Sequence, residues 1–155
     1  MSDPNDIPKN YSISNLKEYE NKAIESYEKG NIIEAFVMIY TILEMELNII
    51  WNIFVSSIIQ TNPRPAPKTK EYSDLVDLLN EFEILNDNQS SILREFKTGR
   101  NKVVHNLPSH MKKKPKTKFI DDEFNKGMKA LDFVDRAIVT TAKKSFPKSL
   151  MPKKT

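Results

Sequence analysis

Apolar residues recur every three or four positions through most of the chain, which is the spacing of one face of an amphipathic helix. The first such set contains Leu16, Tyr19, Ala23 and Tyr27. Asn15 and Glu18 have the spacing of a capping box, and Gly30 suits a helix C-cap. The pattern therefore predicts a first helix from Asn15 to Gly30.

The longest apolar segment follows directly. Its polar positions form one narrow stripe on a helical projection: Glu34, Thr41, Asn48 and Asn52. Asn31 can cap a helix that runs to about Ile59 and spans roughly 40 Å. The short turn before it makes the first two helices antiparallel neighbours. A lipid-facing span would not carry so many polar residues, so we expect a helix buried on several sides of a protein core and no transmembrane segment.

The second half of the chain predicts three more helices. Three prolines between residues 61 and 67 form a stiff loop, after which Ser73 can cap a third helix. A turn at Asn86–Asn88 leads into a fourth helix that ends near Leu107, and a fifth begins around Asp121 and stops before Pro147. The expected fold is an all-α bundle of about five helices with an antiparallel up-and-down core. Residues 13–146 form the domain, between a flexible N-terminus (residues 1–12) and a basic C-terminal tail (residues 147–155).

Composition narrows the chemistry. The 155 residues fit one domain, and the absence of cysteine excludes disulfides, thiolate nucleophiles and zinc–sulfur sites. The first ten residues are polar and lack the features of a signal peptide, so we expect a cytoplasmic protein. Two histidines far from paired acids predict no metal site, and no cofactor is expected. The net charge is only +3, but a lysine run at residues 112–118 can attract a polyanion or can be a solvated linker.

Glu46 is out of place in the apolar second helix. Its helical neighbours are isoleucines: Ile39, Ile42, Ile49, Ile50 and Ile53. A carboxylate in such surroundings needs a cationic or hydrogen-bonding partner, or a proton, and arginine is the natural partner. The alternative is that Glu46 lies at the edge of the apolar face and reaches water. Glu44, near Tyr40, is a second acid of this kind.

The fourth helix breaks two local rules side by side. Its apolar stripe contains Leu93, Phe96, Val103 and Leu107, with Arg100 in the middle. A buried arginine must be paired or face an interface, and Gly99 indicates the close approach of another backbone or a kink. His105 lies about 140° around the helix from Arg100, so either the helix distorts or the site borrows a surface from another chain. Asn101 can share the face of His105, whereas His110 is expected to be an exposed loop residue.

The segment from Arg100 to His105 resembles the Arg-polar-x3-His signature of the HEPN superfamily. The helix order agrees, because two antiparallel helices joined by a tight turn precede the helix that carries the signature. The resemblance extends from Asn15 to Leu107 and implies a metal-independent endoribonuclease, often a toxin or defence component, that works as a homodimer. Such enzymes use the ribose 2′-hydroxyl as nucleophile and leave a cyclic phosphate.

The resemblance also implies roles for individual residues. His105 would shuttle the proton, Arg100 would stabilise the phosphorane, and Asn101 would orient the phosphate or the imidazole. Glu46 or Glu44 would hold Arg100. RNA would be bound by the lysines around the motif, which are Lys102, Lys112, Lys113 and Lys114. Leu107 stands where one branch of the superfamily has a tyrosine modified by a partner nucleotidyltransferase, so regulation by that particular antitoxin is not expected.

Two other interpretations fit the same residues. In the first, the chain is a non-catalytic HEPN-like dimeric module that binds nucleotide, RNA or a protein partner. In the second, it is a structural bundle in which Arg100 and Glu46 form a buried salt bridge and His105 faces solvent. Catalysis requires Arg100 and His105 from two subunits to converge on an open, positively charged cleft.

Overall fold

The computed structural model describes residues 13–58, 70–105 and 117–144, and these ranges contain five helices and no strand. The helices are α1 (Ile13–Glu28), α2 (Ile32–Ile58), α3 (Tyr72–Glu81), α4 (Asp87–His105) and α5 (Lys118–Lys143). The predicted all-α bundle is confirmed. None of these helices is both long and apolar enough to cross a membrane. The predicted N-terminal and C-terminal extensions lie outside the described residues.

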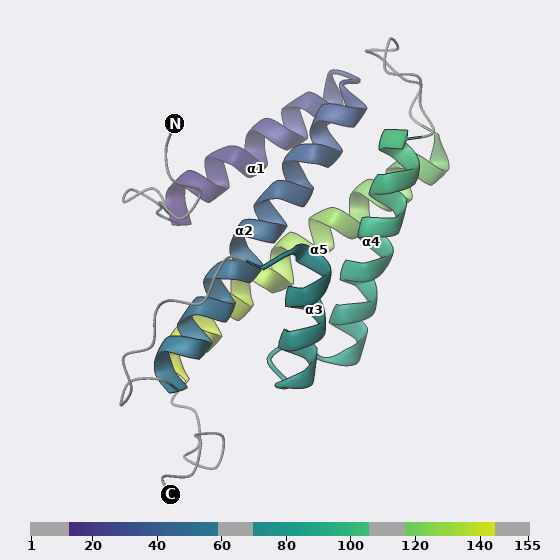
Figure 1. Ribbon diagram of the computed structural model, residues 1–155. Helices are drawn as coiled ribbons and strands as arrows, with labels where there is room; N and C mark the ends of the chain where they lie inside the picture. The colour runs from purple at the N-terminus through teal and green to yellow at the C-terminus, as the bar shows by residue number, and fades with distance from the viewer. Residues whose placement is uncertain (1–12, 59–69, 106–116, 145–155) are drawn as a thin grey trace, which may run out of the picture.

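Helix α2 is the centre of the bundle and packs against each of the other four helices. Figure 1 shows α1 beside the first half of α2, α5 crossing behind α2, and α3 and α4 on the side of α2 away from α1. The buried residues of α2 point to all of these neighbours, which explains why its apolar face is so wide. The prediction of a helix buried on several sides is confirmed.

The turn between α1 and α2 is a Schellman motif. The Gly30 N–H donates to the Tyr27 carbonyl at 3.0 Å, and the Asn31 N–H donates to the Ser26 carbonyl at 2.9 Å. Gly30 has φ = 84°, a conformation that glycine adopts without the strain of a Cβ. The predicted glycine C-cap is therefore correct, and this tight turn keeps α1 against α2.

Two predicted N-caps are wrong, because both helices begin earlier in the sequence than expected. Helix α1 begins at Ile13, so Asn15 lies inside the helix. Helix α3 has Glu71 as its N-cap, and the Ser73 hydroxyl instead accepts a hydrogen bond from Lys97 of α4. The earlier start of α3 places Tyr72 inside the helix, where its side chain is almost completely buried. Burial of a large aromatic side chain outweighs the preference of one capping residue.

Glycines allow α4 and α5 to pack closely. A Cβ on Gly127 of α5 would lie 2.6 Å from the Phe96 ring, and one on Gly99 of α4 would lie 2.0 Å from Glu123 Oε2. The expected close approach at Gly99 is therefore made by the side chain of Glu123, and α4 remains helical through this position. The glycine next to the motif has a packing role.

Candidate functional site

Arg100 projects from α4 toward α2 and is half-buried. The carbon of its guanidinium lies 4.6 Å from the centre of the Tyr40 ring, and its Nη1 donates to Asn101 Oδ1 at 2.9 Å. Its Nε is buried and has no hydrogen-bond partner within the described ranges. No carboxylate in those ranges forms an ion pair with Arg100, so its charge is held in place by an aromatic face and an amide, and is not neutralised.

The ring under Arg100 belongs to a connected aromatic platform. Tyr40 stacks on Tyr72 of α3 with ring centres 4.6 Å apart, and the buried Tyr72 hydroxyl donates to the Leu93 carbonyl of α4 at 2.8 Å. Burial raises the pKa of Tyr40, the charge of Glu44 raises it further, and Arg100 acts in the opposite direction. Glu44 thus lies close enough to influence the platform, although it does not pair with the guanidinium.

His105 is the last residue of α4 and is exposed. Helix α4 remains regular as far as His105, so the alternative of a distorted helix end is wrong. Arg100 and His105 therefore lie about 7.5 Å apart along the helix axis and about 140° around it. Asn101 bonds to Arg100 and not to His105. One chain by itself does not bring Arg100 and His105 to the same face.

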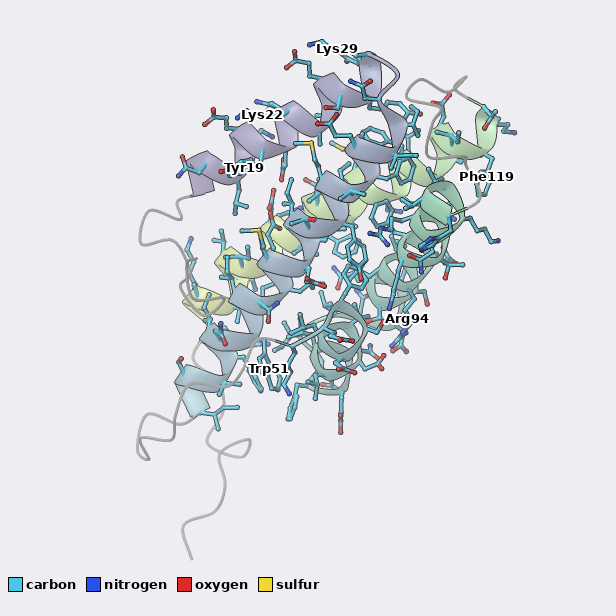
Figure 2. All side chains as sticks on the ribbon, turned by 45° about the horizontal axis from the view of Figure 1, so that its top comes forward. Tyr19, Lys22, Lys29, Trp51, Arg94 and Phe119 are labelled. Carbon is cyan, nitrogen blue, oxygen red and sulfur yellow. The ribbon has the colours of Figure 1, made fainter. Side chains whose placement is uncertain are left out.

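A shallow groove of about 360 Å³ lies between α4 and α5 beside the motif. The predicted RNA-binding residue Lys102 lines it, together with Arg94, Lys126 and the half-exposed ring of Phe119. Arg94 and Phe119 are labelled in Figure 2, on α4 and at the start of α5. The predicted residues Lys112, Lys113 and Lys114 lie outside the described residues.

The cations of this groove are unequally neutralised. Arg94 pairs with Asp77 at 2.9 Å, and Lys126 pairs with Glu123 at 3.0 Å and more loosely with Glu95. Lys102 forms no ion pair with any described residue. It is therefore the cation of the groove most available to an anionic ligand.

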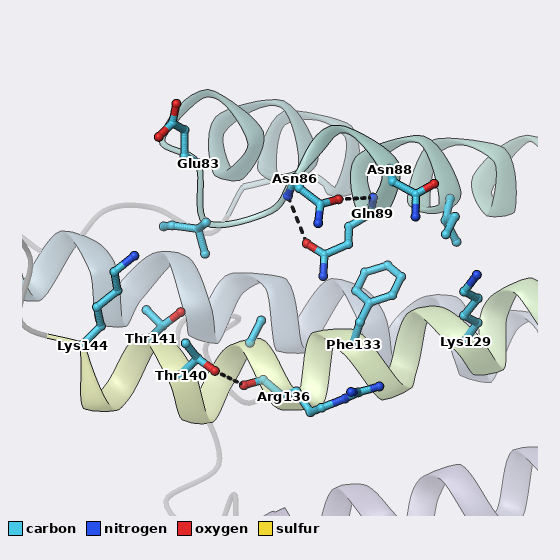
Figure 3. A pocket seen from close by; sticks show the side chains of 13 residues that line it. Glu83, Asn86, Asn88, Gln89, Lys129, Phe133, Arg136, Thr140, Thr141 and Lys144 are labelled. Atoms are coloured by element: carbon cyan, nitrogen blue, oxygen red, sulfur yellow. Dashed lines mark hydrogen bonds between the residues drawn. The ribbon is translucent and has the colours of Figure 1, made fainter.

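A larger groove of about 420 Å³ lies at the opposite end of α4, between the α3–α4 turn and α5. Figure 3 shows Asn86 and Gln89 on one wall and Phe133 and Arg136 on the other. The Asn86 and Gln89 side chains each accept a hydrogen bond from the other residue's backbone N–H, so they cap α4. Among the residues that the structure describes, none of those predicted to be functional lines this groove.

Glu46 has acidic neighbours. Its side chain is fully buried, so the alternative in which it reaches water is wrong, and it does not pair with Arg100. Carboxylate oxygens of Glu20 from α1, Glu46 from α2 and Asp135 from α5 all lie within 4.8 Å of one another. We call these three residues the acidic cluster. Within the described chain, the cation that pairs with it is the exposed Lys17, whose Nζ is 3.8 Å from Glu20.

The pKa values follow from this crowding. Burial, a hydrogen bond with Asp135 and the charges of Asp135 and Glu20 raise the pKa of Glu46 to about 10. Burial and the same aspartate raise the pKa of Glu20 to about 7. At neutral pH without another cation, Glu46 is therefore protonated and can donate a hydrogen bond to Asp135. Of the three acids, only Glu46 could be singled out from the sequence. Its isoleucine neighbours lie close to it along the chain, whereas Glu20 and Asp135 are far from Glu46 in sequence.

Comparisons with known proteins assign no family to the chain. No family model matches it, and neither a curated protein nor a solved structure is significantly similar to it. The likeness to the HEPN superfamily therefore depends on the motif in α4 and on the helix order. Function has to be inferred from these residues and their geometry.

Proposed function

We propose that the protein is a metal-independent endoribonuclease of the HEPN type that acts as a homodimer. The observation that supports this most is the environment of Arg100. Its guanidinium is half-buried, is oriented by Tyr40 and Asn101, and has no paired carboxylate among the described residues. A preoriented cation that is not neutralised suits a phosphate, because a guanidinium fork binds phosphate oxygens directly and stabilises charge that develops on them.

His105 is the proton-transfer group in this proposal. Its exposure at the end of α4 leaves the imidazole free to meet RNA. The neutral imidazole accepts the proton of the ribose 2′-hydroxyl as that oxygen attacks the phosphorus, and the imidazolium returns a proton to the departing 5′-oxygen. The P–O5′ bond breaks, which leaves a 2′,3′-cyclic phosphate and a 5′-hydroxyl. Arg100 stabilises the charged phosphorane between the two steps.

A dimer is required because the two groups face different directions in one chain. A two-fold axis close to the end of α4 would place His105 of one subunit beside Arg100 of the other, and two-fold dimers are the commonest oligomers. Each of the two sites would then use both chains. A role as a toxin or defence nuclease, controlled by an antitoxin protein, would fit this activity and belongs to the proposal.

The groove beside the motif supports an RNA substrate. Lys102 is exposed and has no acidic partner in the described part of the chain, and Phe119 offers a half-exposed ring nearby. Proteins that bind single-stranded RNA combine cations that follow the backbone with aromatic rings on which bases stack. The RNA strand would run from this groove to the dimer interface.

The first experiment measures cleavage of an end-labelled structured RNA by the full chain in excess EDTA. The wild type should leave a cyclic phosphate and a 5′-hydroxyl, and His105→Ala should be slower by at least about a hundredfold, the usual value of acid–base catalysis. Ser91→Ala, another exposed position of α4, is the matched control and should cleave normally. Circular dichroism and light scattering should show that all three proteins are folded dimers at the assay temperature.

A mixing experiment tests the composite site directly. Arg100→Ala and His105→Ala dimers are each inactive if both residues are needed. After subunit exchange, half of the dimers are mixed and each has one intact site, so about a quarter of the wild-type activity should return. No recovery with confirmed exchange would refute a site shared between chains. If the wild type cleaves none of several RNAs, with or without Mg²⁺, the nuclease is refuted, and binding of the same RNA would favour the non-catalytic dimeric module.

A further inference from the structure

The acidic cluster is a concentration of negative charge inside the bundle. Glu20, Glu46 and Asp135 come from three different helices, α1, α2 and α5, and their oxygens converge within 4.8 Å. Glu46 is fully buried and Glu20 is 5% exposed, whereas Asp135 is half-buried. Asp135 therefore provides the side from which a small ion can reach the cluster.

The described residues do not satisfy these carboxylates. When all three groups are ionised, both oxygens of Glu46 and Oε1 of Glu20 are buried with no hydrogen-bond donor among the described residues. The nearest cation, Lys17, is exposed and lies 3.8 Å from the other oxygen of Glu20. Ionised carboxyl groups removed from water are expensive unless they are paired or coordinate a metal. Either a proton retained by Glu46 or a cation bound between the three carboxylates can offset this cost, and a cation would also satisfy both buried oxygens of Glu46.

The dimensions of the cluster suit one ion. Calcium binds oxygen ligands at about 2.3–2.6 Å and magnesium at about 2.0–2.1 Å, so opposite ligands are roughly 4–5 Å apart. The 4.8 Å spread of the three carboxylates is within this range. A donor set of oxygens alone, without histidine or cysteine, selects hard cations such as Mg²⁺, Mn²⁺ and Ca²⁺. Carboxylates that project inward from separate helices are also the usual way in which helical bundles hold metals.

We propose that Glu20, Glu46 and Asp135 bind one divalent cation of this hard, oxygen-preferring class in the core of the bundle. The ion joins α1, α2 and α5, and water completes its coordination on the side of Asp135. Its role is to stabilise the fold. None of the three ligands belongs to the Arg100–His105 motif, so the site is independent of the proposed nuclease and of its EDTA-resistant chemistry.

The test uses the full chain after removal of metals with a chelator. Mn²⁺ titration followed by electron paramagnetic resonance and calorimetry should give one bound ion per chain, which Mg²⁺ or Ca²⁺ displaces. The unfolding midpoint should rise by about 5–10 °C at a hundredfold excess of ion over its dissociation constant. Glu46→Gln and Asp135→Asn should each weaken Mn²⁺ binding by at least about tenfold. Glu34→Gln, an exposed change on the same helix α2, should bind like the wild type.

Two results would overturn the site. The first is the absence of stoichiometric Mn²⁺ binding to the wild type, with no shift of the unfolding midpoint by any of the three ions. The second is binding that persists unchanged in folded Glu46→Gln and Asp135→Asn proteins, which would locate the ion elsewhere. If Glu46→Gln does not fold, Asp135→Asn decides the question, because Asp135 is only half-buried and its replacement disturbs the core less.

Discussion

Replacing Glu46 by glutamine in the metal-free protein should change how stability depends on pH. The side chain is fully buried, and its pKa is raised from 4.5 to about 10 by burial, by Asp135 and by Glu20. Above pH 4.5 the unfolded chain has released this proton, whereas the folded chain retains it. The stability that this group contributes is therefore complete below pH 4.5 and is lost as the pH rises toward 10.

The size of the effect follows from this shift. Between pH 4.5 and 10, each pH unit lowers the free energy of unfolding by about 1.4 kcal/mol. At pH 7.5 the wild type should therefore have lost up to about 4 kcal/mol of stability relative to pH 4.5. Glutamine has the same shape, does not titrate and can donate to Asp135. Glu46→Gln should therefore be more stable than the wild type at pH 7.5, and the difference should grow with pH.

Urea unfolding of both proteins in EDTA at pH 5.5, 6.5, 7.5 and 8.5 measures this difference. Glu20, with a pKa near 7, and its partner Lys17 are present in both proteins, so the difference isolates position 46 to first order. Glu34→Gln should have the pH profile of the wild type. A difference that does not change with pH, or a Glu46→Gln protein that is less stable than the wild type at pH 8.5, would mean that Glu46 is ionised and paired in the folded state.

Three further substitutions test the packing and the turn geometry of the bundle, each by urea unfolding of the full chain. Gly127→Ala should cost about 1–3 kcal/mol, because the new Cβ would lie 2.6 Å from the buried Phe96 ring; unchanged stability would mean that α4 and α5 are further apart. Glu83→Gly should stabilise by up to about 1 kcal/mol, because residue 83 has φ = 60° in the α3–α4 turn; a loss of stability would argue against that conformation. Tyr72→Phe should cost about 0.5–1.5 kcal/mol, because it removes the 2.8 Å hydrogen bond from the Tyr72 hydroxyl to the Leu93 carbonyl, which keeps its own bond within α4; no cost would mean that the hydroxyl bond is absent.

The helices could be predicted from the sequence because their signals are local. Apolar spacing depends only on residues within a few turns, and the Gly30 turn needs one residue that tolerates positive φ. The N-cap of α3 was predicted wrongly because burial of Tyr72 depends on neighbours that come later in the chain. Local preferences amount to about 1 kcal/mol, whereas burying an aromatic side chain contributes more.

The partners of Arg100 could not be predicted from the sequence. The position of Arg100 in an apolar stripe predicted a buried cation that needs a partner, and the structure places it half-buried on α4. The partner was expected to be Glu44 or Glu46, but the structure supplies the ring of Tyr40 and the amide of Asn101. Either kind of partner satisfies the same local pattern. The choice depends on how α4 is rotated against α2.

Glu46 separates the two kinds of information most clearly. The sequence by itself determined that this carboxyl lies among isoleucines and therefore has to be paired or protonated. Only the tertiary structure decided that its neighbours are two further acids, because Glu20 and Asp135 reach it from α1 and α5. Hydrophobic periodicity indicates which face of a helix is buried, but it does not indicate which other helix packs against that face. The relative rotation and sliding of packed helices is set by the fit of side chains from distant parts of the chain.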